Sequence, residues 1–227
     1  MDAVILAGGL GTRLKGVISN IPKPLAPING RPFLDILFKQ ISTFALIDRV
    51  ILATGYLAGH ISSYYEGKSY PFSLLFSEET TPLGTGGALK QAMTQVLSET
   101  FFVLNGDSFF DINFHLMNEM HQKKKAQFTI ACAYVEDISR YGEVKLDEIG
   151  KVISFNEKSS TQKAGWINGG IYLINQKVIL SEKIEFSLEK EVVPRLVDQA
   201  LFGFQSKGKF IDIGTAQSYN LAQEILL

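Results

Sequence analysis

The stretch Met1-Asp2-Ala3-Val4-Ile5-Leu6-Ala7 runs directly into Gly8-Gly9-Leu10-Gly11-Thr12-Arg13-Leu14, so an apolar segment ends at a glycine-rich loop. The apolar segment is short and no basic residue precedes it, which predicts a buried first strand and not a signal peptide. Glycines expose backbone N–H groups that together form an anion-binding nest, and Arg13 adds a fixed positive charge. We therefore predict a loop that binds a triphosphate, with a tight turn beside a surface arginine as the structural alternative.

Two other phosphate-binding loops are excluded by their spacing. A P-loop has Gly-Lys-Ser/Thr after four intervening residues, which this stretch lacks. A dinucleotide-binding fingerprint has glycine where Leu14 stands and an acidic residue at the end of the second strand, whereas Asp35 lies within a predicted helix. A dehydrogenase is therefore disfavoured.

Beyond this loop, short β-branched runs alternate with helix-like segments through the first half of the chain. The alternation is typical of an α/β fold in which helices cover both faces of a mostly parallel sheet. The expected strands are Ala3–Leu6, Arg49–Thr54, Phe72–Phe76, Phe101–Leu104 and Phe128–Tyr134. The expected helices are Pro32–Phe44, Ala58–Tyr65, Gly86–Val96 and Asn113–Lys124.

From Gly142 onward the pattern is that of antiparallel strands. Gly142–Leu146 and Lys151–Asn156 alternate around the turn Asp147-Glu148-Ile149-Gly150, which predicts a hairpin. The chain is therefore expected to form one Rossmann-like α/β domain, with a mixed but mostly parallel sheet and a small antiparallel portion. The remaining expected elements are a strand at Ile167–Ile174, a helix at Ser187–Leu196, a strand region at Phe202–Phe210 and a helix at Ala216–Ile225.

The composition narrows the range of partners and compartments. The chain has 227 residues and a formal net charge of -1, so nucleic acid and anionic membranes are not expected partners, since both require a basic surface. The single cysteine, Cys132, excludes an intramolecular disulfide and a cysteine-based metal cluster, and it fits a reducing cytoplasm. No apolar run reaches the roughly 18 residues that a membrane span requires.

Six further motifs follow the glycine loop and, together with it, resemble the signature of the sugar-phosphate nucleotidyltransferase family over nearly the whole chain. The motifs are Pro22-Lys23-Pro24, Pro82-Leu83-Gly84-Thr85-Gly86-Gly87, Asn105-Gly106-Asp107, Phe155-Asn156-Glu157-Lys158, Asn168-Gly169-Gly170 and Asp212-Ile213-Gly214-Thr215. The resemblance implies a GT-A-like fold in which residues 1–110 mainly bind the nucleotide and residues 111–227 mainly bind the sugar phosphate. The C-terminal β-helix that many relatives carry is not expected here.

The resemblance also implies a one-step reaction. An oxygen of a sugar 1-phosphate attacks the α-phosphorus of a nucleoside triphosphate, and pyrophosphate leaves in line. Such a step requires positioning and charge neutralisation rather than a protein nucleophile. The catalytic residues are expected to be Arg13, which holds the triphosphate, and Lys23, which two flanking prolines stiffen. Asp107 ends an apolar strand, and together with Asp212 it is expected to bind the cofactor Mg²⁺.

The substrate-binding residues come from the same resemblance. For the nucleotide they are Leu6, Ala7, Gly8, Gly9, Gly11, Thr12, Glu78 (or its neighbour Glu79), Gly84, Thr85, Gly86 and Asp107. For the sugar phosphate they are Tyr141, Gly142, Glu157, Lys158, Asn168 and Gly169. Lys158 is expected to meet the sugar phosphate, and Glu157 and Asn168 to bind sugar hydroxyls, whereas sheet packing is the alternative role for Tyr141.

The glycine motif after Pro82 resembles the guanylyltransferase version, which favours GTP as the nucleotide. The favoured acceptor is D-glycero-α-D-manno-heptose 1-phosphate, for capsule, S-layer or lipopolysaccharide glycans. Guanylyl transfer to mannose 1-phosphate, and uridylyl or thymidylyl transfer to a hexose 1-phosphate, are the alternatives. A regulator that binds a sugar nucleotide without turnover is disfavoured, because Arg13, Lys23, Asp107 and Asp212 are all present. Relatives are commonly dimers or tetramers, so a homo-oligomer is compatible with the resemblance.

Overall fold

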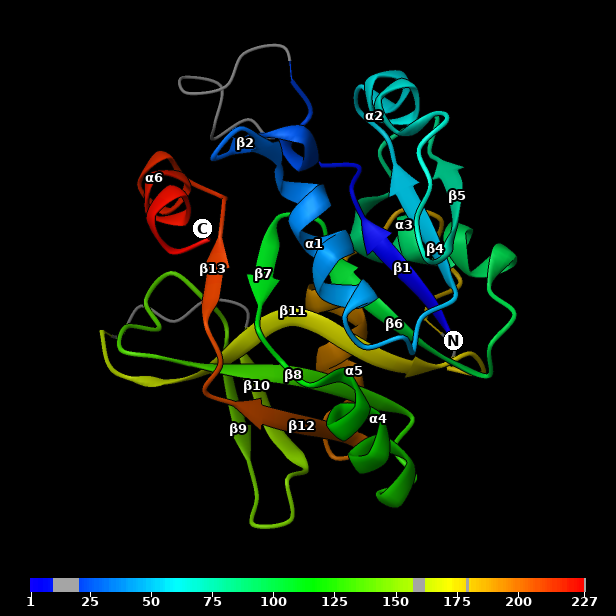
Figure 1. Cartoon of the computed structure of the whole chain (residues 1–227). Coiled ribbons are helices and arrows are strands. Elements are labelled where there is room, and N and C mark those ends of the chain that lie inside the picture. The colour runs from blue at the N-terminus through cyan, green and yellow to red at the C-terminus, as the bar shows by residue number, and fades with distance from the viewer. Residues whose placement is uncertain (10–20, 157–161, 179, 227) are drawn as a thin grey trace.

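A nine-stranded mixed sheet runs through the molecule (Figure 1). The computed structural model describes residues 1–9, 21–156, 162–178 and 180–226. Seven strands follow the order β10-β9-β11-β6-β1-β4-β5, while β8 pairs with β11 and β12 pairs with β8. The predicted α/β class, a mostly parallel sheet with helices around it and a smaller antiparallel part, is confirmed.

The parallel part of the sheet consists of four strands. β1 (Asp2–Leu6) lies between β4 (Arg49–Thr54) and β6 (Thr100–Asn105), and β5 (Ser73–Glu78) pairs with β4 at the edge. Because the strands are parallel, their carboxyl ends lie at the same edge of the sheet. Open α/β sheets bind their ligands at that edge.

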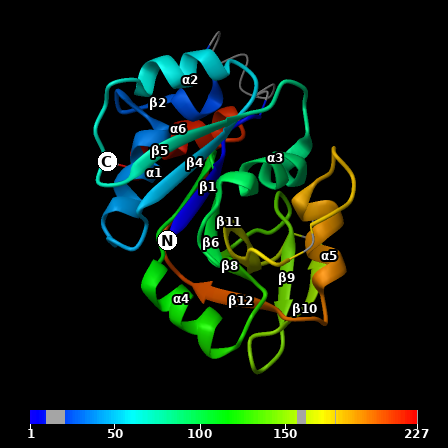
Figure 2. The ribbon, with the colours of Figure 1, turned by 90° about the vertical axis from the view of Figure 1, so that its right-hand side faces the viewer.

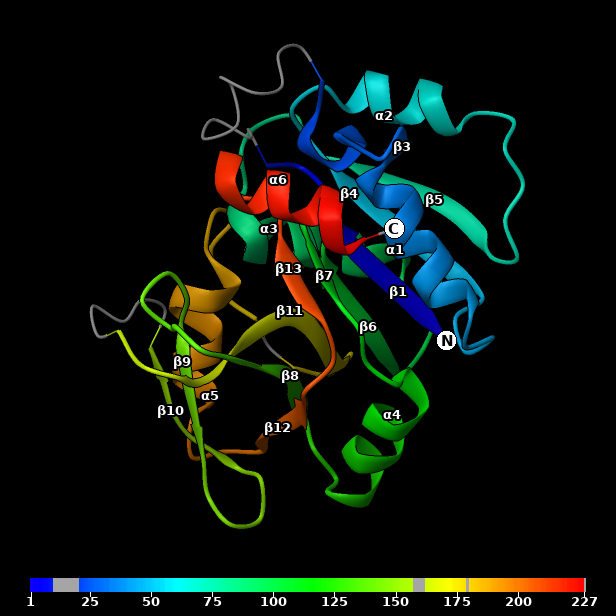
Figure 3. The same ribbon diagram turned by 60° about the vertical axis from the view of Figure 1, so that its left-hand side comes forward.

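The antiparallel part is joined to β6 by the long strand β11 (Gly165–Asn175), which also pairs with β8 (Phe128–Val135). β9 (Glu143–Leu146) and β10 (Val152–Asn156) form the predicted hairpin, which extends away from the parallel strands (Figure 3). β12 (Leu201–Ser206) runs parallel to β8.

Two small sheets complete the described strands. β2 (Pro27–Ile28) pairs with β3 (Arg31–Pro32). β7 (Ser108–Phe110) pairs with β13 (Phe210–Asp212), so segments about a hundred residues apart in the chain lie side by side. This second pair brings the two predicted metal-binding motifs together.

Helices flank the sheet on both sides (Figure 2). Side chains of α1 (Phe33–Ser42) and α4 (Phe114–Lys123) enter one hydrophobic cluster, and those of α3 (Gly84–Ala92) and α5 (Val193–Leu196) enter another. The other helical elements are α2 (Ala58–Tyr65), α6 (Ala216–Ile225), the 3-10 turns η2 (Lys23–Leu25) and η3 (Met93–Gln95), and the π-helical turn η4 (Leu188–Val192). Among the helices of the described residues, none combines the length and the apolar character needed to cross a bilayer.

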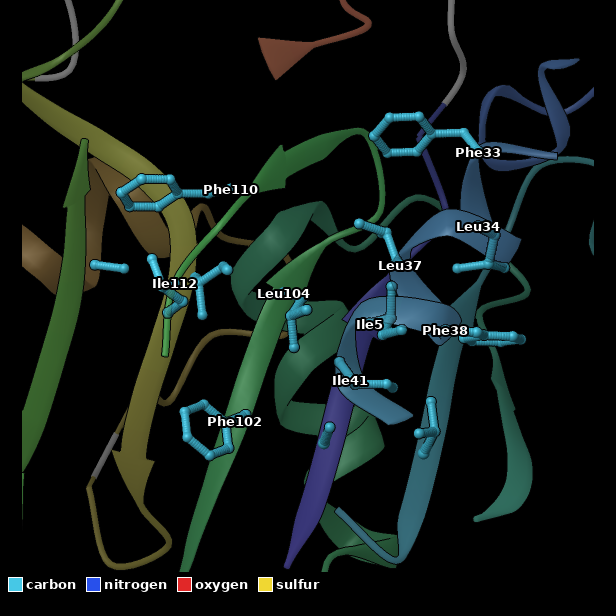
Figure 4. Packing of buried hydrophobic residues seen from close by; sticks show 14 of the residues in the cluster. Ile5, Phe33, Leu34, Leu37, Phe38, Ile41, Phe102, Leu104, Phe110 and Ile112 are labelled. Carbon is cyan, nitrogen blue, oxygen red and sulfur yellow. The ribbon is translucent and has the colours of Figure 1, made fainter. Parts of the chain in front are cut away.

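The central strand β1 contributes to both clusters. Ala3 and Ile5 belong to the cluster on the α1 side, whereas Val4 belongs to the cluster on the α3 side. Successive side chains of a strand point to opposite faces, so an uninterrupted apolar run is what a strand buried on both faces requires. Figure 4 shows the α1 cluster, in which the buried side chains of Leu37 and Phe38 lie near Ile5.

Two predicted elements were wrong in detail. The strand region expected at Phe202–Phe210 is two strands in different sheets, β12 and β13, and the chain turns between them at Gly208, where a Cβ would collide with the Asp111 carbonyl. The helix expected at Ser187–Leu196 begins as the π-helical turn η4 and continues as the short helix α5. Ser187 caps this turn, because its side chain accepts a hydrogen bond from the Lys190 N–H.

Candidate active site

A cavity of about 290 Å³ opens at the carboxyl ends of β1 and β6. Its wall combines the ends of these strands, the turn η2, and the start of α3. The lining residues are Leu6, Ala7, Gly8, Gly9, Lys23, Pro24, Glu79, Pro82, Gly84, Thr85, Ala88, Asn105, Gly106 and Asp107. The cavity therefore gathers most of the described residues that were predicted to bind a nucleotide.

Bare backbone forms the floor of this cavity. The Gly106 N–H donates a hydrogen bond to the Leu6 carbonyl over 2.9 Å, and a Cβ at Gly106 would lie only 2.7 Å from that oxygen. A Cβ at Gly8 would lie 2.8 Å from Oε1 of Glu79. Side chains at these two positions would collide with the β1 backbone and with Glu79, so glycine is what allows these segments to approach so closely.

An ion pair occupies one side of the cavity. Nζ of Lys23 lies 2.5 Å from Oδ2 of Asp107, and the two side chains are 13% and 40% exposed. Lys23 begins the turn η2 between Pro22 and Pro24, and the Leu25 N–H closes that turn on the Pro22 carbonyl at 2.8 Å. The prolines restrict the backbone on both sides of the lysine, so the backbone position from which its side chain extends is fixed.

Asp212 lies beside this pair. The Ile213 N–H donates to the Asp107 carbonyl over 2.9 Å, as the β7–β13 pairing requires. A Cβ at Gly214 would lie 2.6 Å from Oδ1 of Asp212 and 3.8 Å from Nζ of Lys23. The structure therefore brings Lys23, Asp107 and Asp212 together.

Tyr141, predicted on the acceptor side, contacts the same carboxylate. Its hydroxyl donates to Oδ2 of Asp212 over 2.6 Å, while the Arg140 guanidinium lies 3.4 Å from that oxygen. Burial raises the pKa of Tyr141, and the bond to Asp212 raises it further, so the hydroxyl keeps its proton and remains a donor. The hydrogen bond shows that Tyr141 does more than pack against the sheet.

A glutamate after β5 lines the cavity, and it is Glu79 and not Glu78. The Leu83 N–H donates to Oε2 of Glu79 over 3.2 Å. Burial raises the pKa of Glu79, and the Leu83 bond offsets part of this rise. The two glutamates are neighbours on an extended segment and point to opposite sides, which the sequence motif alone did not resolve.

The glycine motif before α3 has two roles. Gly84 and Thr85 line the cavity, and Gly84 has a φ of 71°, which favours glycine. Gly86 does not line it, because its α-carbon faces the ring of Phe186, where a Cβ would collide. The first residues of the motif therefore line the cavity, and its last residues pack against residues 184–188.

The other described acceptor residues lie on β11 and before β9. Asn168 donates through Nδ2 to the Tyr172 hydroxyl at 2.7 Å, and its backbone N–H donates to the Gly142 carbonyl at 3.4 Å. Gly169 packs against the Phe110 ring and the Ala131 carbonyl. None of these residues lines the cavity, and we refer to this set, which was predicted to bind the acceptor, as the acceptor wall.

Five predicted residues lie outside the described part of the chain. They are Gly11, Thr12, Arg13, Glu157 and Lys158. Five residues that line the cavity were not among the predicted site residues, namely Pro24, Pro82, Ala88, Asn105 and Gly106. All except Ala88 belong to the motifs quoted in the sequence analysis, and their place in those motifs was the available signal.

The described residues contain no group of three or more histidine, cysteine or acidic side chains that could hold a metal. Asp107, directly before β7, and Asp212, at the end of β13, supply two carboxylates where these two strands pair. Mg²⁺ is commonly bound by one or two carboxylates, with phosphate oxygens and water in the other positions. The oxygen donors of this pair suit such an ion.

Comparisons with known proteins find relatives along nearly the full length of this chain. The D-glycero-alpha-D-manno-heptose 1-phosphate guanylyltransferase of Aneurinibacillus thermoaerophilus is 40% identical, over 100% of this chain and 98% of that protein. The protein of the same name from Campylobacter jejuni is also 40% identical, over 96% of this chain and 97% of that one. The crystal structure of HddC from Yersinia pseudotuberculosis complexed with GMP-PN is 35% identical, with a TM-score of 0.89 over 100% of this chain and 99% of that one. Because the Nucleotidyl transferase family matches residues 2–227, which is almost the whole chain, the chain belongs to that family.

Proposed function

We propose that the protein transfers a guanylyl group from GTP to D-glycero-α-D-manno-heptose 1-phosphate and releases pyrophosphate. The observation that carries the proposal is the Lys23–Asp107 ion pair in a cavity whose floor is bare backbone. Two relatives named for this reaction are 40% identical over nearly the full chain. A neighbour with 35% identity was crystallised with the guanine nucleotide GMP-PN.

Glu79 supports guanine as the base. Guanine presents two adjacent donors, N1–H and the exocyclic N2 amino group, and an ionised carboxylate accepts from both. Uracil and thymine present one N–H between two carbonyl oxygens, which a carboxylate repels. A site with a fixed acceptor rejects a base that lacks the matching donors. Burial raises the pKa of Glu79, and the same burial strengthens the hydrogen bonds that its carboxylate accepts.

The transfer step uses groups of this chain to bind and orient. An oxygen of the acceptor phosphate forms a bond to the α-phosphorus, the bond from the α-phosphorus to the oxygen that bridges to the β-phosphate breaks, and pyrophosphate leaves with that electron pair. We assign Lys23 to the α-phosphate oxygens, since its ammonium group is already held in place by Asp107. Arg13 is assigned to the departing pyrophosphate because it ends the glycine loop.

We assign Asp107 and Asp212 to a Mg²⁺ ion. Asp107 directly precedes β7, which pairs with the strand that carries Asp212, and the half-exposed Asp107 carboxylate lines the cavity. A Mg²⁺ held by these two carboxylates would neutralise charge on the phosphate groups. The hydrogen bond from Tyr141 to Oδ2 helps to fix the orientation of the Asp212 carboxylate, whose Oδ1 accepts from the Gly214 N–H over 2.7 Å and from the Ser218 hydroxyl over 3.2 Å.

The test is a matrix of substrates with the purified full chain. GTP, ATP, UTP, CTP and dTTP are each paired with the 1-phosphates of D-glycero-D-manno-heptose, mannose and glucose, and Mg²⁺-dependent pyrophosphate release is measured. We expect GTP to be the best nucleotide and the heptose phosphate the best acceptor. A higher rate with mannose 1-phosphate would contradict the acceptor, and turnover with UTP or dTTP alone would contradict the base. Binding of GTP without turnover in any pair would favour the regulator.

A further inference from the structure

Glu189, on the π-helical turn η4, accepts hydrogen bonds from three hydroxyl groups. They belong to Thr85 at 2.6 Å, Ser187 at 3.2 Å and Tyr172 at 3.2 Å. The side chain is half-buried, and no described lysine, arginine or histidine forms an ion pair with it. A carboxylate in this position is held by neutral donors from different parts of the fold.

One of these donors belongs to the nucleotide cavity. Thr85 lines that cavity from the first turn of α3. Its Oγ1 accepts from the Leu188 N–H over 2.9 Å while it donates to Oε2 of Glu189. Glu189 thereby holds the first turn of α3 against the turn η4.

A second donor, Tyr172, contacts a residue of the acceptor wall, Asn168. The Tyr172 hydroxyl donates to Oε1 of Glu189 and accepts from Nδ2 of Asn168. Oδ1 of Asn168 accepts from the Gly170 N–H over 3.0 Å, so both ends of the amide are oriented. Tyr172 is fully buried; burial raises its pKa well above the ordinary value and the charge of Glu189 raises it further, so the hydroxyl stays protonated.

Only an ionised carboxylate fits all these partners. It accepts on both oxygens, whereas the amide of glutamine would present N–H groups on one side. Thr85 already accepts from Leu188, and Tyr172 already accepts from Asn168, so each has its proton available for Glu189. An amide at this position would leave one of these protons without an acceptor.

We propose that Glu189 is a positioning residue that aligns the nucleotide cavity with the acceptor wall, through Thr85 on one oxygen and Tyr172 with Asn168 on the other. The proposal rests on the proposed function, since it assigns the two walls to the two substrates. It adds that a single carboxylate couples both walls, so its loss affects both substrates. Loss of Thr85 or Tyr172 bonding affects one substrate each.

The experiment compares Glu189→Gln, Thr85→Val and Tyr172→Phe with wild type. We expect Glu189→Gln to raise KM for GTP and for the sugar phosphate by about tenfold each, the value of one hydrogen bond to a charged group. Thr85→Val should raise mainly KM for GTP, and Tyr172→Phe mainly KM for the sugar phosphate. The matched control is Glu191→Gln, two residues away, whose exposed carboxylate pairs with Lys183 and should leave both KM values unchanged.

Thermal melting separates positioning from folding. If Glu189→Gln lowered Tm but left both KM values within twofold of wild type, the residue would be purely structural and the proposal overturned. A change in only one KM would overturn the coupling. Wild-type turnover in the same assay tests the proposed function separately. If wild type shows none, calorimetric binding of GTP still tests Glu189, because an unchanged Kd in Glu189→Gln would count against its role.

Discussion

The two walls of the site are built in different ways. On the nucleotide side, the ends of parallel strands and glycines such as Gly8 and Gly106 present backbone to the cavity. On the side that we propose to bind the acceptor, side chains hold one another, as Tyr141 holds Asp212 and Tyr172 links Asn168 to Glu189. The first wall depends on close backbone approach and the second on chains of hydrogen bonds. Substitutions should therefore damage the two walls by different mechanisms.

The largest expected effect is at the ion pair between the two walls. Lys23→Ala removes a preorganised cation, and Asp107→Asn removes a carboxylate that holds it, so each should lower kcat by roughly 100- to 1,000-fold. Steady-state kinetics measure the loss, and circular dichroism checks the fold. Lys177→Ala, at an exposed lysine, is the control. Rates near wild type in both variants would show that the pair is not catalytic.

The base-reading role of Glu79 gives the next effect. Glu79→Gln replaces one acceptor by a donor, so kcat/KM for GTP should fall about tenfold and the ratio of UTP to GTP turnover should rise. Since the pKa of Glu79 is raised, wild-type kcat/KM for GTP should also fall as the pH is lowered toward that pKa and the carboxylate is protonated. Glu79→Gln should lose this acid limb. If kcat/KM of the variant fell at low pH in the same way as that of wild type, the titrating group would not be Glu79.

A glycine substitution tests the backbone wall. Gly106→Ala places a Cβ 2.7 Å from the Leu6 carbonyl, and neither β1 nor β6 can move aside, so the free energy of unfolding should fall by about 1–3 kcal/mol. Gly59→Ala, where a Cβ meets no atom within 4 Å, is the matched control and should leave stability unchanged or raise it. Denaturant unfolding compares the two. Equal stabilities would mean that the wall tolerates side chains.

Tyr141→Phe tests one hydrogen bond among the residues that we propose to bind the acceptor. The variant removes the hydroxyl that donates to Asp212 but keeps the ring that packs against Phe210. KM for the sugar phosphate or kcat should change by about three- to tenfold, with KM for GTP within twofold. Kinetics with each substrate varied separately decide the outcome. A larger change in KM for GTP than in KM for the sugar phosphate would assign Tyr141 to nucleotide binding.

The smallest effect concerns the pH dependence of stability at His121, on α4. His121 is buried against Thr129, and burial lowers its pKa from 6.5 to about 4. Between these values the unfolded chain binds a proton that the folded protein does not, so stability falls as the pH drops through this window. Denaturant unfolding at pH 7, 6 and 5 should show a slope that His121→Gln reduces. Parallel slopes would mean that His121 titrates normally.

The parallel half of the fold could be predicted because each strand is a short apolar run bounded by helix signals. β1 and β4 were expected with nearly their observed bounds, and the β9–β10 hairpin followed from its turn at Gly150. The pairing of β7 with β13 could not be predicted, since a three-residue strand carries no pattern of its own. Such pairing depends on contacts between segments far apart in the chain.

Site residues could be predicted where a sequence motif contains them. They could not be predicted where the fold decides which of two adjacent residues faces the cavity. Lys23 and Asp107 were selected by their motifs, and the structure places them in contact. Glu78 was selected although Glu79 lines the cavity, because strand direction decides which of two adjacent carboxylates faces inward. In the sequence, the apolar neighbours of Tyr172 indicate only a core position. Its proposed role in positioning follows from its hydrogen bonds to Asn168 and Glu189.

The central claim is that Lys23, Asp107 and Asp212 act on one triphosphate bound over the glycine floor. A crystal structure with Mg²⁺ and a GTP analogue that cannot be cleaved tests it directly. The account predicts the guanine beside Glu79, the α-phosphate at the Lys23 ammonium, and the metal between the two aspartates. Phosphates bound away from Lys23, or a metal that contacts neither aspartate, would contradict it.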